Sequence, residues 1–147
     1  MNFYSLNGKA PEVGLEEAVV RGIAPDKGLY FPESITPLPQ SFFDNIETLS
    51  NNEIAFTAIR QFVDGVIPDE ALKDIIADVL SFDFPVVEVE ENIGTLELFH
   101  GPTMAFKDVG ARFMARCLGY FSAQKETQEP VTVLVATSGD TGGAVAR

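Results

Sequence analysis

Lys107 is the residue whose type and neighbours best suit covalent chemistry. It lies in the segment 98–108 (LFHGPTMAFKD), after the turn-forming pair Gly101-Pro102 and before apolar residues at helical spacing. Residues 104–106, which precede it directly, are apolar. A lysine that serves only solubility gains nothing from such neighbours. We therefore expect Lys107 to be partly desolvated and able to form a Schiff base with a carbonyl compound.

A second motif lies in the loop 137–143 (TSGDTGG). It follows the continuous apolar run 131–136, which predicts a buried strand, and precedes a predicted helix start at 144–146. Backbone N–H groups and hydroxyls at a strand–loop–helix junction bind anions. The loop matches neither a P-loop nor the dinucleotide fingerprint. A Schiff-base lysine together with an anion loop predicts a pyridoxal phosphate (PLP) enzyme that acts on an amino acid.

The first 85 residues predict a small mixed α/β domain that precedes both motifs. We expect short strands at 3–5 and 29–31, a helix from Leu15 with a glycine stop at Gly22, and two longer helices. Asn52 is the predicted cap of the first longer helix, and Pro68 opens the second.

Residues 86–147 predict the first part of a mainly parallel αβα sheet domain, truncated before its end. The boundary is expected at 82–85, followed by strands at 86–90, 95–99 and 131–136. Between the last two strands, a helix is predicted after Lys107 from six apolar residues at helical spacing: Val109, Phe113, Met114, Cys117, Leu118 and Phe121.

The composition excludes several classes of partner. The 147 residues carry 22 acidic and 10 basic side chains, a net charge of -12, which argues against nucleic acids and anionic membranes. The start of the chain shows no signal peptide or membrane span. Cys117 is the single cysteine, so no intrachain disulfide is expected, and a cytoplasmic location follows. No cluster of histidine and cysteine predicts a metal.

Three segments carry a resemblance to a known family. Residues 100–108 (HGPTMAFKD), 136–142 (ATSGDTG) and 22–32 (GIAPDKGLYFP) resemble signatures of the threonine synthases in their longer form. These enzymes belong to the fold-type II (tryptophan synthase β-like) PLP family. Lys27 stands where the family often has glycine, and Met104 is at a variable position. The family's chains are much longer, so the resemblance implies an N-terminal fragment.

The resemblance implies a PLP-dependent lyase of threonine biosynthesis that converts O-phospho-L-homoserine and water to L-threonine and phosphate. Lys107 would be the catalytic, cofactor-holding residue, and Asp140 would also bind the cofactor. An Asp at this position favours threonine synthases over related enzymes that often carry Asn. The implied substrate-binding residues are Thr103, Ser138, Gly139, Asp140 and Thr141.

Several alternatives stay open. The enzyme could be another PLP lyase of the same fold, such as a dehydratase or a cysteine synthase. The contrasting hypothesis is a folded fragment that is inactive because the phosphate cup and the partner of the pyridine nitrogen lie further along the chain. His100 suits a structural role at least as well as a catalytic one, and Thr103 suits a helix cap. The end at Arg147 suits either trypsin-like cleavage or design.

The expected partner is a small-molecule substrate, with no nucleic acid and no membrane. The full-length protein is expected to be a monomer or weak dimer. The fragment is expected to self-associate through the unpaired edge of the strand at 131–136.

Overall fold

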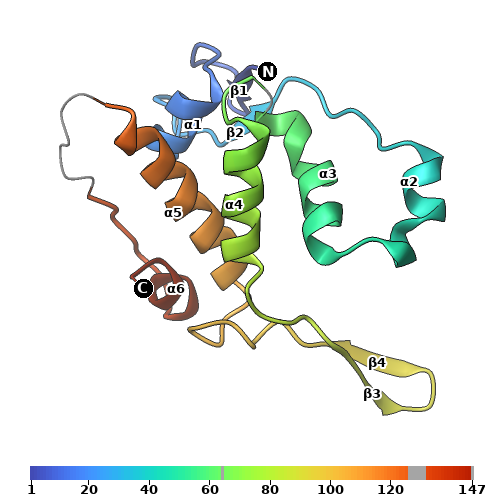
Figure 1. Ribbon diagram of the computed structural model, residues 1–147. Helices are drawn as coiled ribbons and strands as arrows, with labels where there is room; N and C mark the ends of the chain where they lie inside the picture. The colour runs from blue at the N-terminus through green and yellow to red at the C-terminus, as the bar shows by residue number, and fades with distance from the viewer. Residues whose placement is uncertain (64, 126–131, 147) are drawn as a thin grey trace. The chain divides into compact units, whose positions relative to one another are not determined.

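The computed structural model describes residues 1–63, 65–125 and 132–146, and it divides into two compact units, Met1–Ala77 and Asp78–Arg147. Figure 1 shows the helices and strands in chain order. Both units combine helices with short strands, which confirms the predicted mixed α/β class.

The first unit begins with a small antiparallel sheet. Strand β1 (Phe3–Ser5) pairs with β2 (Tyr30–Pro32), and helix α1 (Leu15–Arg21) lies between them in the chain. Gly22 ends α1 with φ 68, a backbone region that glycine enters at little cost. The predicted strands and the glycine stop are confirmed, with β2 displaced by one residue.

Asp26 holds the turn between α1 and β2. Its carboxylate accepts hydrogen bonds from Ser5 Oγ at 2.6 Å, from the Lys9 N–H at 2.9 Å and from the Gly28 N–H at 3.0 Å. The hydrogen bond from Ser5 lowers the pKa of this carboxyl group. A Cβ on Gly28 would lie 2.0 Å from Ser5 Oγ, so this turn requires glycine there.

The rest of the first unit is helical. It contains α2 (Gln40–Asp44), a 3₁₀ turn η1 (Ile46–Thr48), α3 (Asn51–Val63) and α4 (Asp69–Val79). Helices α3 and α4 confirm the two longer predicted helices, whereas α2 and η1 were not expected. The predicted Asn52 cap is wrong, because Ser50 and Glu53 form a reciprocal capping box instead. Buried apolar residues in α3, in α4 or between them include Val63, Ile67, Leu72, Ile75 and Ile76.

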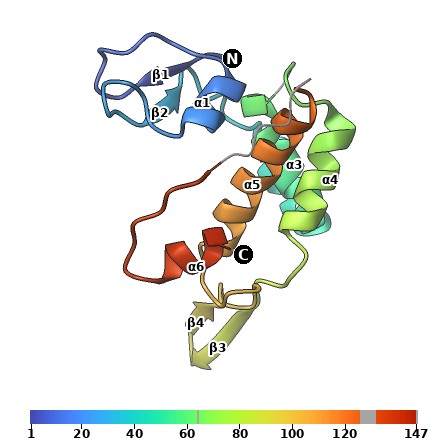
Figure 2. The same ribbon diagram turned by 90° about the vertical axis from the view of Figure 1, so that its left-hand side faces the viewer.

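The second unit contains β3 (Val86–Glu90), β4 (Ile93–Leu96), α5 (Asp108–Ala123) and α6 (Asp140–Ala146). Strands β3 and β4 form an antiparallel hairpin in which every residue is exposed, and β4 ends at Leu96 instead of running over 95–99. Helices α5 and α6 lie side by side (Figure 2). Helix α5 buries Cys117 and Phe121, as its apolar spacing predicts.

The predicted strand 131–136 is not present in its described part. Residues 132–136 form no strand, and residue 131 lies outside the described residues. A parallel strand exists only through hydrogen bonds to neighbouring strands, which propensity alone cannot supply. The side chain of Leu134 is 91% exposed, so this run is not buried either. The strand edge on which the predicted self-association depended is therefore not present among residues 132–136, and both described sheets are antiparallel.

Candidate functional site

The loop that carries Lys107 consists of two consecutive turns. The Met104 N–H donates to Gly101 O at 3.1 Å, and the Asp108 N–H donates to Ala105 O at 3.0 Å. Met104 has φ 58, a left-handed conformation that costs a non-glycine residue about 1 kcal/mol. The loop thus delivers Lys107 to the N-cap position of α5.

Lys107 is exposed, which corrects the expectation of desolvation. Its Nζ lies 4.4 Å from the centroid of the Phe106 ring. Phe106 and Met104 are themselves 57% and 77% exposed, so they cannot enclose the amine. The apolar neighbours of Lys107 in the sequence therefore do not form an apolar cage around its amine.

Lys107 lines a pocket of about 410 Å³ between the start of α5 and helix α6. This volume lies within the range of small-molecule sites. Thr141 is the second polar lining residue, and Lys107 is the only charged one among the described residues that line it. Phe106, Gly110, Ala111, Met114 and Val145 complete the lining. The two sequence motifs therefore meet here through Lys107 and Thr141.

Asp108 is the first residue of α5, and its side chain is almost completely buried. It is 1% exposed, and its carboxylate accepts a 2.9 Å hydrogen bond from the Thr103 N–H and a 2.5 Å bond from the Thr103 hydroxyl. The expectation that Thr103 caps α5 is wrong, since its hydroxyl bonds a side chain and the cap residue is Lys107. Asp108 is the acidic residue of the first turn of α5, and the sequence did not predict its burial.

The loop before α6 is organised by Thr137. Its Oγ1 accepts hydrogen bonds from the N–H groups of Gly139 and Gly142, each at 3.0 Å. Two of the backbone donors in the predicted anion loop are therefore used within the loop. Ser138, Gly139 and Asp140 are exposed, and they line neither of the two pockets of the second unit described here.

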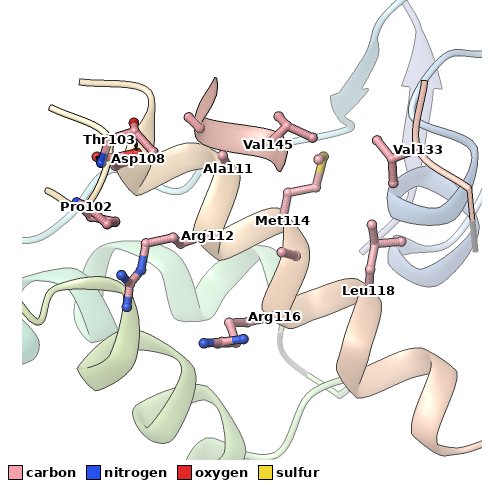
Figure 3. Close-up of a pocket in the computed structure, with 12 residues that line it drawn as sticks. Pro102, Thr103, Asp108, Ala111, Arg112, Met114, Arg116, Leu118, Val133 and Val145 are labelled. Atoms are coloured by element: carbon pink, nitrogen blue, oxygen red, sulfur yellow. Dashed lines mark hydrogen bonds between the residues drawn. The ribbon is translucent and has the colours of Figure 1, made fainter. Parts of the chain in front are cut away.

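A second pocket of about 310 Å³ lies beside the first, also between α5 and α6 (Figure 3). Thr103 and Asp108 lie together at one end of it, while Met114 and Val145 approach each other from the two helices. Thr103 is thus separated from the Lys107 pocket, which it does not line.

Arg112 and Arg116 connect α5 to residues 78–81, and both also line the second pocket. In Figure 3 the guanidinium groups of Arg112 and Arg116 point away from Met114. Arg116 Nε donates to Asp78 Oδ2 at 2.6 Å, and Arg112 donates to Asp78 O at 2.6 Å and to Ser81 Oγ at 3.2 Å. The hydrogen bond from Arg116, with the charges of both arginines, lowers the pKa of Asp78. Arg112 and Arg116 are four residues apart and therefore share a face of α5. This spacing is visible in the sequence.

His100 is paired away from Lys107. Its Nε2 lies 2.7 Å from Glu97 Oε2, and its ring stacks on Phe99 with centroids 4.8 Å apart. It lines neither pocket, which favours the structural alternative over a catalytic one.

Among the described residues, no group of three or more His, Cys, Asp and Glu side chains is arranged to hold a metal ion. No helix among them is long and apolar enough to cross a membrane.

Comparison with known proteins decides the family. A family model described as threonine synthase N terminus matches residues 2–80, more than half of the chain. The chain belongs to the threonine synthase family. The threonine synthases of Escherichia coli and Haemophilus influenzae are 39% and 40% identical to it over 146 residues, which is 99% of this chain. The alignment covers 33% of each relative, so the chain spans about a third of their length.

Solved structures of threonine synthases are similar to this fold. The crystal structure of the Escherichia coli threonine synthase matches with a TM-score of 0.90 at 39% identity, covering 99% of this chain and 33% of that one. The PLP-bound threonine synthase from Brucella melitensis matches with a TM-score of 0.79 at 33% identity, covering 84% of this chain and 28% of that one. Both matches extend beyond the region of the family model and include segments of the second unit.

Proposed function

We propose that this chain is part of a threonine synthase that converts O-phospho-L-homoserine and water to L-threonine and phosphate, with PLP as cofactor. The observation that carries the proposal is the pocket in which Lys107 and Thr141 meet, in a chain of the threonine synthase family. The activity is proposed for the complete gene product, because the relatives are about three times as long as this chain.

The chemistry of the pocket suits an aromatic aldehyde cofactor. Its walls are apolar, and Lys107 supplies a primary amine at one rim. When bound, PLP would supply an electron sink for the bonds at the substrate's α-carbon. Lys107 Nζ would hold the cofactor and, once freed by the substrate amine, would take up and return protons at the α- and β-carbons. The exposure of Lys107 in this chain leaves its amine accessible for both tasks.

We propose roles for the remaining site residues together with those of PLP and Lys107. Thr141 is supported by its place in the Lys107 pocket. Ser138 and Gly139 are supported by their position in the loop that leads into α6, and Asp140 by its place as the first residue of α6, directly before Thr141. Asp140 is proposed to contact the cofactor as well as the substrate. For Thr103 the proposal is narrower: its hydroxyl donates to Asp108, so it could serve the substrate only as an acceptor.

We propose that residues 1–147 without further polypeptide are inactive. Lys107 is the only charged residue among the described residues lining its pocket, and one amine cannot also bind the phosphate groups of cofactor and substrate. We further propose domains at 1–85 and 86–147, a cytoplasmic location consistent with the buried free thiol of Cys117, and a monomeric or weakly dimeric full-length protein.

Steady-state assays on the complete gene product test the proposal. We expect phosphate release and threonine formation from O-phospho-L-homoserine, and no comparable turnover of serine, threonine or O-acetylserine. Lys107→Ala should abolish turnover, whereas Lys125→Ala, the same change at an exposed lysine beyond α5, should leave it unchanged. Turnover retained by Lys107→Ala would refute the role of Lys107. A preference for O-acetylserine or serine would instead indicate one of the related lyases.

A further inference from the structure

We propose that Asp108 is a positioning residue for Lys107: its buried carboxylate holds the loop 101–107 in the conformation that presents the lysine. The inference rests on the proposed function and extends it to a residue that does not line the Lys107 pocket. It also gives Thr103, proposed above as an acceptor for the substrate, a structural role as the partner of Asp108.

The carboxylate of Asp108 is buried and hydrogen-bonded. Burying an ionised carboxylate is costly unless hydrogen bonds replace those lost to water. Asp108 is 1% exposed, and Thr103 supplies both a backbone N–H and a hydroxyl to its two oxygens. Bonds to a charged acceptor are stronger than neutral ones, so this pair fixes Thr103 relative to the first turn of α5.

The carboxylate of Asp108 also contacts the start of the loop, at Gly101. Gly101 is buried, and a Cβ placed on it would lie 2.4 Å from Asp108 Oδ2 and 2.9 Å from Phe82 Cζ. The carboxylate therefore packs directly on the backbone of Gly101 as well as bonding Thr103. The Asp108 side chain therefore contacts the loop at its first residue, Gly101, and near its middle, at Thr103.

The backbone of Lys107 is fixed by helix α5, whereas its side chain is exposed and is not fixed by burial. Its carbonyl oxygen accepts the Ala111 N–H at 2.9 Å, which ties its backbone to the helix on one side. Its side chain is exposed, with the Phe106 ring at 4.4 Å from Nζ, so burial does not fix it. The loop conformation must then set the direction from which the lysine enters the pocket, and Asp108 holds that loop.

Matched variants of the complete gene product separate positioning from stability. Thr103→Val removes the hydroxyl at nearly constant shape, and Thr103→Ser restores it. Asp108→Asn keeps the shape and removes the charge. Asp83→Asn makes the same change at an exposed site of the same unit and serves as the control. Each variant is examined for kcat and KM, for hydrogen exchange of the peptide 101–108, and for labelling of Lys107 by an amine reagent without cofactor, relative to Lys125.

We expect Thr103→Val and Asp108→Asn to accelerate exchange in 101–108, to shift the Lys107:Lys125 labelling ratio and to lower kcat by roughly 10²-fold, with much smaller changes in KM. Thr103→Ser should recover most of the loss, and Asp83→Asn should match the wild type. A general loss of stability would lower the fraction of active enzyme, but it would not accelerate hydrogen exchange selectively in residues 101–108.

Unchanged exchange in 101–108 would overturn the proposal, since the carboxylate would not hold the loop. Faster exchange with unchanged kcat would overturn it too, since the loop would not position the lysine. If the wild type turned over none of the substrates, the proposed function would fail separately. The labelling ratio would then decide alone, and an unchanged ratio in Thr103→Val would overturn the positioning role.

Discussion

Gly101→Ala is the smallest change that should disturb the loop of Lys107. Gly101 is not among the residues with positive φ, so alanine can adopt its backbone conformation and the effect should be purely steric. The new Cβ would lie 2.4 Å from Asp108 Oδ2, whereas ordinary contact begins at 3.4 Å. Either the carboxylate or the loop must therefore move by about 1 Å.

The magnitude follows from that displacement. Overpacking of a buried site costs about 1–3 kcal/mol in stability, because neighbouring groups leave their preferred positions. A 1 Å misplacement of a reacting group can cost roughly 10²-fold in rate. Since Asp108 directly follows Lys107, we expect Gly101→Ala to lower kcat by between about 10- and 100-fold and to lower the melting temperature.

Phosphate release measures kcat, and thermal unfolding with and without PLP measures stability. Gly119→Ala is the matched control, because it lies in α5 with nothing within 4 Å of the added Cβ. This control should keep wild-type kcat and gain up to about 1 kcal/mol from helix propensity. Wild-type kcat in Gly101→Ala, at temperatures where it is folded, would refute the reasoning.

Two predictions concern side chains near α5. Burial raises the pKa of the Cys117 thiol to about 11, so we expect iodoacetamide to react slowly at pH 8 in the native protein and rapidly after denaturation, as followed by intact mass. Arg116 and Arg112 lower the pKa of Asp78, so its ionised form stabilises the fold above its ordinary pKa. We expect Asp78→Asn to destabilise by at most about 1 kcal/mol at pH 7, a difference that disappears as pH falls through and below about 4.

For both the Cys117 and the Asp78 prediction, a specific result would contradict the reasoning. Alkylation of native Cys117 as fast as that of the denatured chain would show that the thiol is not protected. For Asp78, urea titrations of wild type and variant at pH 7 and pH 3 are compared. A difference that stays constant between the two pH values would mean that the charge of Asp78 is not responsible.

The sequence predicted the parts of the fold that local periodicity determines. The apolar spacing of α5, the proline before α4, the glycine at the end of α1 and the turn before Lys107 all involve residues within a few positions of one another. The Ser50–Glu53 capping box was also visible as a Ser followed three residues later by Glu, but Asn52 was preferred to it.

The sequence failed where the outcome depends on distant partners. The run 131–136 has the composition of a buried strand, but residues 132–136 form none, because a strand needs a neighbour that local sequence does not specify. Met104 and Phe106 are likewise largely exposed and do not enclose the amine of Lys107. Asp108 was missed for the opposite reason: an acidic residue in a first helical turn is usually exposed, and only the folded loop buries it.

The most direct test of the account is the site of cofactor attachment. The complete gene product is incubated with PLP, reduced with borohydride and digested, and the modified lysines are mapped by mass spectrometry. We expect a single modified lysine, Lys107, with Lys9, Lys27, Lys73 and Lys125 unmodified. Modification spread over these lysines, or modification that spares Lys107, would contradict the claim that the pocket of Lys107 and Thr141 is the cofactor site.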